Sequence, residues 1–152
     1  MVKQIEIYTD GACRGNPGPG GYGAVLKYRR HRKEISGGFR ETTNNRMEIF
    51  AAIAALEQLI EPCEITLYSD SRYLVDAVSK RWLANWKRRG WIKADKQPVL
   101  NVDLWRRLEA AMAPHRLKFV WVRGHASNAE NNRCDELAVA AATRGNLPED
   151  PR

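Results

Sequence analysis

Four carboxylates in the chain each stand where a predicted strand or helix meets a turn. They are Asp10 in YTDGA, Glu48 in NRMEI, Asp70 in YSDSR and Asp135 in RCDEL. Hard divalent cations such as Mg²⁺ bind oxygen ligands, and carboxylates held close together repel one another unless a cation lies between them. A fold that gathers these four side chains would form a divalent-metal site suited to phosphodiester chemistry.

Each carboxylate also has an ordinary structural interpretation. Asp10 is followed by glycine, and an Asp-Gly pair is a common turn signal. Glu48 lies three residues after Asn45 and could complete a capping box at a helix start. Asp70 could cap the helix that follows it, and Asp135 could lie on a solvated helical face.

The surroundings of Glu48 favour a shared function for the four carboxylates. Glu48 stands between Met47 and Ile49 on a mostly apolar predicted helix, where an unpaired carboxylate is costly to bury. Two metal ions about 4 Å apart would compensate the charge and stabilise the attacking and leaving oxygens of a phosphodiester. His125, ten residues before Asp135, could move a proton there, although a lone loop histidine is often only a surface residue.

The hydrophobic pattern predicts an α/β fold, a five-stranded mixed sheet flanked by helices, with three antiparallel strands followed by parallel ones. The predicted strands cover residues 2–10, 21–28, 34–40, 65–70 and 117–122. The predicted helices cover residues 43–60, 71–78, 98–113 and 129–144. Pro62 is expected to end the first helix, whose apolar stripe includes Ile60. If the crossover lays the fourth strand beside the first, Asp10 and Asp70 emerge about 5 Å apart.

Composition favours one domain with a polyanionic partner. The chain has 152 residues, a net charge of +7 and a pI of about 9.6, so nucleic acid is the first candidate partner and an anionic membrane the second. We expect a single domain over residues 1–143 and a flexible, polar tail over 144–152. Three separated cysteines without a CxxC pair, and no long apolar stretch, predict a cytoplasmic protein with free thiols that needs no membrane; a monomer is expected.

Positive charge is concentrated in residues 80–96, which we call the basic handle. This segment has a local net charge of +6, and it includes Lys87, Arg88 and Arg89. Trp82 and Trp86 lie one helical turn apart within it. The tryptophans could form a small core, but the gathered cations favour a surface that follows phosphates.

The chain resembles bacterial type 1 ribonuclease H (ribonuclease HI) from about Val2 to Ala142. Five blocks carry the resemblance in order: YTDGACRGNPGPGGYGAVL, TTNNRMEIFAAIAAL, SDSRYL, WKRRGWIKADKQPVLNVDLW and GHASNAENNRCDELA. The resemblance implies the fold expected above and an endoribonuclease that hydrolyses the RNA strand of RNA/DNA hybrids, leaving 3′-hydroxyl and 5′-phosphate ends. It further implies two Mg²⁺ ions, replaceable by Mn²⁺. Their implied ligands are Asp10, Glu48, Asp70 and Asp135.

The resemblance also implies roles for other residues. His125 matches a histidine that assists proton transfer or product departure. The positions that match hybrid-contacting residues in the minor groove are Cys13, Asn16, Asn44 and Asn45. Thr43 and Asn101 match a pocket for a DNA-strand phosphate, and the basic handle matches the family's protruding handle with Trp82, Trp86, Lys87, Arg88 and Arg89.

Three charged residues depart from the pattern of the family. Arg72 and Asp76 stand where neutral polar groups are expected near the RNA strand. Arg72 is still expected to bind the substrate there with altered contacts, although Arg72 and Asp76 could instead pair across one helical turn. Glu41 replaces a basic residue beside the phosphate pocket. Two rival functions stay open at this point: a non-catalytic hybrid-binding module, and a related two-metal nuclease or transposase-like enzyme that acts on DNA.

Overall fold

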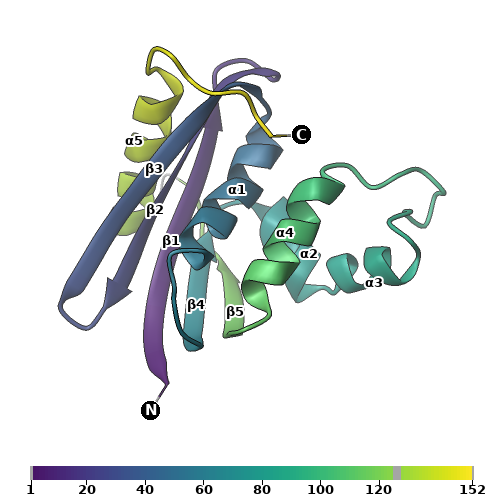
Figure 1. Cartoon of the computed structure of the whole chain (residues 1–152), viewed down its shortest axis with the longest axis horizontal. Helices are drawn as coiled ribbons and strands as arrows, with labels where there is room; N and C mark the ends of the chain where they lie inside the picture. The colour runs from purple at the N-terminus through teal and green to yellow at the C-terminus, as the bar shows by residue number, and fades with distance from the viewer. Residues whose placement is uncertain (1, 125–127, 152) are drawn as a thin grey trace.

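A computed structural model of the chain describes residues 2–124 and 128–151. The five strands are β1 (Lys3–Cys13), β2 (Gly18–Tyr28), β3 (His31–Thr42), β4 (Cys63–Ser69) and β5 (Arg116–Trp121). They form one sheet in the order β3-β2-β1-β4-β5 (Figure 1). β1, β2 and β3 pair antiparallel, whereas β4 pairs parallel with both β1 and β5. The predicted five-stranded mixed sheet is therefore confirmed.

The helices cover both faces of this sheet. They are α1 (Asn44–Leu56), α2 (Arg72–Ser79), α3 (Trp82–Arg88), α4 (Val102–Met112) and α5 (Ala129–Ala142). α5 packs against β1, β2 and β3 on one face, and α1 lies on the other face with α4 packed against it (Figure 1). α3 and the loop after it extend away from the sheet. Within the described residues, no helix has both the length and the apolar character needed to cross a membrane.

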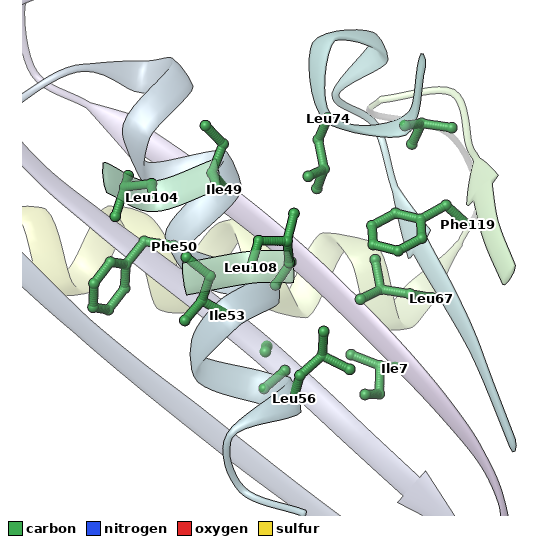
Figure 2. Packing of buried hydrophobic residues seen from close by; sticks show 14 of the residues in the cluster. Ile7, Ile49, Phe50, Ile53, Leu56, Leu67, Leu74, Leu104, Leu108 and Phe119 are labelled. Carbon is green, nitrogen blue, oxygen red and sulfur yellow. The ribbon is translucent and has the colours of Figure 1, made fainter. Parts of the chain in front are cut away.

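The main core lies between the sheet and the pair of helices α1 and α4. Figure 2 shows Leu104 and Leu108 of α4 beside Ile49 and Ile53 of α1, with Ile7 of β1 below them. All five side chains are buried, none with more than 2% of its surface exposed. Because α1 carries apolar residues on most of its circumference, it can contact β1 and α4 at once.

The structure corrects several predicted boundaries. α1 ends at Leu56, well before Pro62, because the chain must return to the level of Lys3, where β4 begins with the Lys3–Cys63 pair. Ile60 is 97% exposed, so its place in an apolar stripe was wrong. β1 continues past Asp10 to Cys13, because β2 keeps pairing with it over this length.

Two of the capping interpretations are also wrong. Thr43 is the N-cap of α1, and its Oγ1 accepts a hydrogen bond from the Arg46 N–H at 3.2 Å. Glu48 lies too far along the helix to complete a capping box there. Ser71 caps α2, so Asp70 is free of that role.

A buried ion-pair cluster joins the start of α1 to α4 and to the C-terminal residues. The Arg46 guanidinium lies 2.7 Å from Asp103 and 2.6 Å from Asp150, and the Thr42 hydroxyl donates to Asp150 at 2.6 Å. Only 4% of the Arg46 side chain is exposed. Arg46 lowers the pKa of Asp103 through charge-assisted hydrogen bonds. The tail therefore packs on the domain in this structure, while its flexibility in solution stays a prediction.

Replacing Arg46 with methionine should destabilise the protein by about 3–5 kcal/mol, because two carboxylates lose a buried cation. Urea unfolding at pH 7 measures the loss. Arg107→Met, which breaks an exposed pair with Glu57, is the matched control and should cost about 1 kcal/mol or less. If Arg46→Met lowered the free energy of unfolding by no more than the Arg107→Met control does, a buried structural role of Arg46 would be contradicted.

The difference in the free energy of unfolding between the parent protein and Arg46→Met should depend on pH. Because the folded-state pKa of Asp103 is lowered, its stabilising contribution is present above the ordinary aspartate pKa, about 3.9, and is lost as the pH falls through the folded-state value. The stability difference between the parent protein and Arg46→Met should therefore narrow below about pH 4.

Candidate metal centre

Parallel pairing of β1 with β4 brings the first two carboxylates together. Thr9 pairs with Ser69, so the next residues, Asp10 and Asp70, lie side by side at the same edge of the sheet. Asp10 is still within β1, whereas Asp70 follows the last residue of β4. The predicted adjacency of the two aspartates is confirmed, and ligand sites of α/β sheets favour this edge.

A close approach of α1 to β1 adds Glu48. A Cβ atom on Gly11 would lie 2.6 Å from the backbone nitrogen of Glu48 and 2.6 Å from the carbonyl carbon of Met47. Only glycine leaves room for the helix at this point. The Gly11 N–H also donates a hydrogen bond to the Glu48 carboxylate. The glycine of the Asp-Gly pair thus positions the helix that carries Glu48.

The three carboxylates form a compact acidic cluster. One oxygen from each of Asp10, Glu48 and Asp70 lies within 4.8 Å of the others. Asp10 and Glu48 are each only 6% exposed, and Asp70 is half-buried. Burial, followed by the charge of Asp70, raises the pKa of Asp10 to about 8; burial, followed by the charges of Asp10 and Asp70, raises the pKa of Glu48 well above its usual range.

The donor set of this cluster fits a hard divalent cation. Glu48 Oε1 is buried, and no hydrogen-bond partner is present for it among the described residues. A buried, unpartnered carboxylate oxygen is costly unless a ligand compensates it. Three carboxylates in reach of one point supply the all-oxygen environment that Mg²⁺ prefers.

Asp135 joins the cluster from the other face of the sheet. It lies on α5, is half-buried, and shares a hydrogen bond with Asp10 that helps to raise the pKa of Asp10. Gly23 allows α5 to come this close, because a Cβ atom there would lie 2.6 Å from the Cys134 carbonyl oxygen. Asp135 is outside the compact set of three oxygens. It adjoins Asp10 and so occupies the rim of the cluster.

The loop from β5 to α5 approaches the cluster beside Asp70. A Cβ atom on Gly124 would lie 2.8 Å from Asp70 Oδ2. His125 follows directly, but residues 125–127 lie outside the described part of the chain. The role expected for His125 therefore stays a prediction.

Four residues expected to contact a hybrid lie where the β1–β2 turn meets the start of α1. Asn16 Oδ1 accepts a hydrogen bond from the Asn44 N–H at 3.1 Å, and Asn45 is exposed beside it. The Cys13 thiol donates to the carbonyl oxygens of Thr42 and Gly18 at 3.3 and 3.4 Å. The structure thus brings together residues from two separate motifs.

Arg46 connects Thr43 with Asn101. Besides the cap with Thr43, an Arg46 guanidinium N–H donates to Asn101 Oδ1 at 3.3 Å, and Asn101 Nδ2 donates to the Tyr73 hydroxyl at 3.3 Å. Arg46 was not among the residues that the sequence predicted for this region. A buried cation on the same apolar helix as Glu48 was the available signal, because such a charge requires partners. Glu41 is exposed beside this region, next to Arg40, which pairs with Glu149 at 2.7 Å.

The basic handle contains α3, and its two tryptophans differ in their environment. The Trp86 ring lies 5.7 Å from the buried Trp105, whereas Trp82 packs on Trp86 at 6.3 Å and is 38% exposed. Lys87, Arg88 and Arg89 are exposed at the end of α3. The small-core interpretation thus describes Trp86, while the cations of the handle face solvent.

Arg72 and Asp76 do not pair with each other. Asp76 lies 3.5 Å from Lys80, one turn further along. The Arg72 guanidinium instead lies over the Trp121 ring, 3.9 Å from its centroid. The predicted pair was wrong because an aromatic face at the end of β5 is within reach of the first residue of α2.

Comparisons with known proteins agree with this geometry. The family model described as RNase H matches residues 2–143. Ribonuclease H of Klebsiella pneumoniae subsp. pneumoniae is 58% identical over 149 residues, covering 98% of this chain and 96% of that protein. Ribonuclease H of Salmonella arizonae is 61% identical over 142 residues, covering 93% and 91%.

Two solved structures show the same fold. A type 1 RNase H with the type 2 active-site motif aligns with a TM-score of 0.84 at 32% identity, covering 93% of this chain and 73% of that one. An RNase H1 crystallised in complex with RNA/DNA hybrid aligns with a TM-score of 0.67 at 31% identity, covering 91% and 96%.

Glu48→Gln should raise the stability of the metal-free protein at neutral pH by about 1–3 kcal/mol, because an uncharged amide of the same size avoids the penalty that burial and the neighbouring acids place on the charged carboxylate. The folded-state pKa of Glu48 is raised, so in the parent protein its favourable protonated form is lost as the pH rises through that value. The advantage of Glu48→Gln should therefore grow above about pH 4.5.

Thermal unfolding with EDTA and with Mg²⁺ measures this effect. Mg²⁺ should stabilise the parent protein more than Glu48→Gln. Glu64→Gln removes an exposed carboxylate at the far end of β4. It should change neither the unfolding temperature in EDTA nor the stabilisation by Mg²⁺. Equal Mg²⁺ stabilisation of all three proteins would place the cation elsewhere.

Proposed function

Because the chain belongs to the ribonuclease H family, we propose that it hydrolyses the RNA strand of RNA/DNA hybrids by a two-metal-ion mechanism, leaving 3′-hydroxyl and 5′-phosphate ends. The observation that carries the proposal is the acidic cluster of Asp10, Glu48 and Asp70, in which Glu48 Oε1 has no hydrogen-bond partner among the residues that the structure describes. These groups lie at the open edge of the sheet, where a nucleic-acid backbone can reach them.

The carboxylates have distinct proposed roles. Asp10 lies in hydrogen-bond contact with Glu48, Asp70 and Asp135, so these four carboxylates together would hold the metal ions, with Asp10 as the ligand common to the whole cluster. When bound, two Mg²⁺ ions would activate the attacking water and stabilise the departing oxygen. Mg²⁺ is proposed because every donor is a carboxylate oxygen, and Mn²⁺ accepts the same donors.

Proton transfer is proposed for His125. An imidazole has an unperturbed pKa near 6.5, so it can accept and release a proton at neutral pH. The assignment rests on its match to the family histidine and on the approach of Gly124 to Asp70. The proposed role is to carry a proton during water attack or product departure.

Substrate recognition is proposed for two flanking surfaces. Cys13, Asn16, Asn44 and Asn45 lie together and would meet the minor groove, where an RNA strand displays its 2′-hydroxyls. Thr43 and Asn101, joined through Arg46, would hold a phosphate of the DNA strand. The exposed cations of the basic handle would follow the backbone further along.

The working unit is proposed to be a cytoplasmic monomer with one domain over residues 1–143. This domain would include the basic handle over 80–96, with 144–152 as an appended tail. The contacts of Arg46 support including Asp150 in any variant used for assay, because the buried pair would otherwise be broken.

Cleavage of end-labelled RNA/DNA hybrid tests the proposed function. Single-stranded RNA, duplex RNA and duplex DNA are assayed beside it, with Mg²⁺ and with EDTA. Only the RNA strand of the hybrid should be cut, and only with metal. Asp10→Asn should reduce the rate on the order of a thousandfold or more while hybrid binding persists, because the proposed metal site loses its central carboxylate.

Three results would contradict the proposal. Full turnover by Asp10→Asn would remove the metal assignment, with Glu64→Gln as the matched carboxylate control expected to retain activity. Hybrid binding without cleavage by the parent protein would favour a non-catalytic module. Cleavage of duplex DNA would favour the related two-metal DNA nuclease.

Replacing Lys87, Arg88 and Arg89 by glutamine in one variant should weaken hybrid binding and make it depend less steeply on salt concentration. Each lost phosphate contact should reduce the slope of log K against log salt by about 0.7–0.9. The control changes Arg29, Arg30 and Lys33 to glutamine, which removes the same charge from the β2–β3 hairpin at the opposite end of the sheet. An unchanged slope for the handle variant would show that the handle does not touch phosphates.

A further inference from the structure

We propose that Trp121 is a positioning residue that holds the Arg72 guanidinium as a clamp for an RNA-strand phosphate beside the acidic cluster. The proposal rests on the proposed hybrid substrate. Trp121 is an exposed aromatic side chain to which the proposed catalytic mechanism gives no role. Its contact with Arg72 explains how a cation replaces the neutral polar group expected at position 72.

Trp121 ties the end of β5 to the backbone of a cluster residue. Its indole Nε1–H donates to the Asp70 carbonyl oxygen at 3.1 Å. The next residue, Val122, donates its N–H to the Ser69 carbonyl oxygen at 2.9 Å. Two successive carbonyl groups at the end of β4 are therefore fixed by β5, although Trp121 itself is 38% exposed.

The face of the same indole carries Arg72. The guanidinium carbon lies 3.9 Å from the ring centroid, which is the distance of direct stacking. The other guanidinium–aromatic pairs within the described residues are longer, between 5.1 and 5.5 Å. Trp121 therefore makes two contacts at once: its Nε1–H binds the backbone of Asp70, and its ring packs against the guanidinium of Arg72.

The backbone that carries Arg72 is rigid as well. The Ser71 N–H donates to Ser69 Oγ at 3.0 Å, and Ser71 Oγ accepts the Leu74 N–H at 3.2 Å as the cap of α2. Arg72 is the first residue of that helix, two positions after Asp70. A fixed backbone and a stacked head group leave the long side chain little rotational freedom to lose on binding a ligand.

Arg72 keeps its hydrogen-bond donors for a ligand. Among the described residues, no carboxylate lies within 4.0 Å of its guanidinium, and Asp76 on the next turn is paired with Lys80. Stacking uses the face of the guanidinium and leaves the N–H groups at its edge. A planar fork of donors matches the oxygens of a phosphate, which it can bind through two parallel hydrogen bonds.

The position of Arg72 beside the carboxylates allows it to attract a phosphate that the acidic cluster would otherwise repel. Asp10, Glu48 and Asp70 concentrate negative charge where a phosphodiester must approach, and like charges repel. A guanidinium held two residues from Asp70 attracts the phosphate next to the one that reacts. It would orient the RNA strand and act on binding of the substrate more than on the chemical step.

Kinetics with hybrid substrate at several salt concentrations test the proposal, using the full chain with Mg²⁺. Arg72→Gln should raise KM about five- to tenfold, leave kcat within about twofold, and reduce the salt slope of kcat/KM by about 0.7–0.9. Trp121→Leu should produce the same three changes although it removes no charge. The double variant should be no worse than either single one, because both remove one contact.

Conservative variants separate positioning from a structural role. Trp121→Phe keeps an aromatic face and should retain the salt slope of the parent, although it loses the Nε1–H bond to Asp70. Arg72→Lys keeps the charge without the planar fork and should raise KM as Arg72→Gln does. Arg30→Gln removes one charge from the distant β2–β3 hairpin and should change neither KM nor slope.

Several outcomes would overturn the proposal. A parental salt slope in Trp121→Leu, or effects of the two single variants that multiply in the double variant, would show that the residues act separately. If Trp121→Leu fails to fold, Arg72→Lys decides, because a parental KM would exclude a bidentate clamp. A parent protein that does not cleave hybrid would contradict the proposed function itself. A parent protein that cleaves hybrid normally, with KM and salt slope unchanged in the variants, would contradict only the clamp.

Discussion

Repulsion among buried carboxylates is the constraint around which the fold is arranged, because like charges at this distance must be held together by the rest of the chain. Parallel pairing of β1 with β4 fixes Asp10 next to Asp70. Gly11 admits α1, and Gly23 admits α5, so that one acid arrives from each face of the sheet. The apolar contacts of α1 with β1 and α4 supply the stability that offsets this repulsion.

The separation of charge follows from the same constraint. A chain that binds a polyanion next to an acidic cluster needs positive charge elsewhere, and the net charge of +7 is carried mostly by the basic handle. The backbone of the handle extends away from the sheet (Figure 1), and the ion pairs made by its lysines go to Asp76, Glu109 and Asp95, outside the acidic cluster. Under the proposed function, negative charge would stay available for cations at this edge of the sheet, while the handle would attract the backbone of the substrate from a distance.

The parts of the site that the sequence predicts are those set by local patterns. Strand alternation and the crossover rule place Asp10 beside Asp70 without any knowledge of packing. The approach of Glu48 depends on a glycine contact between a strand and a helix, and the pairing of Arg46 with Asp150 joins residues 104 positions apart. Arg72 stacks on Trp121 rather than pairing with Asp76 for a similar reason. Such contacts are decided by tertiary packing, which neither spacing nor periodicity records.

Two buried charges on one helix show how structural and functional groups can be told apart. Arg46 and Glu48 lie two residues apart on α1, with 3% and 6% of their surfaces exposed. Arg46 is satisfied by Asp103 and Asp150 from its own chain, so its burial stabilises the fold and requires no ligand. Glu48 receives a backbone hydrogen bond from Gly11 and shares a side-chain hydrogen bond with Asp10, but it faces two further acids, and its Oε1 has no partner within the described part of the chain. A buried charge whose hydrogen bonds are all satisfied within the chain indicates a structural role. A buried charge with an oxygen that lacks a partner, as Glu48 has, indicates a site for a ligand.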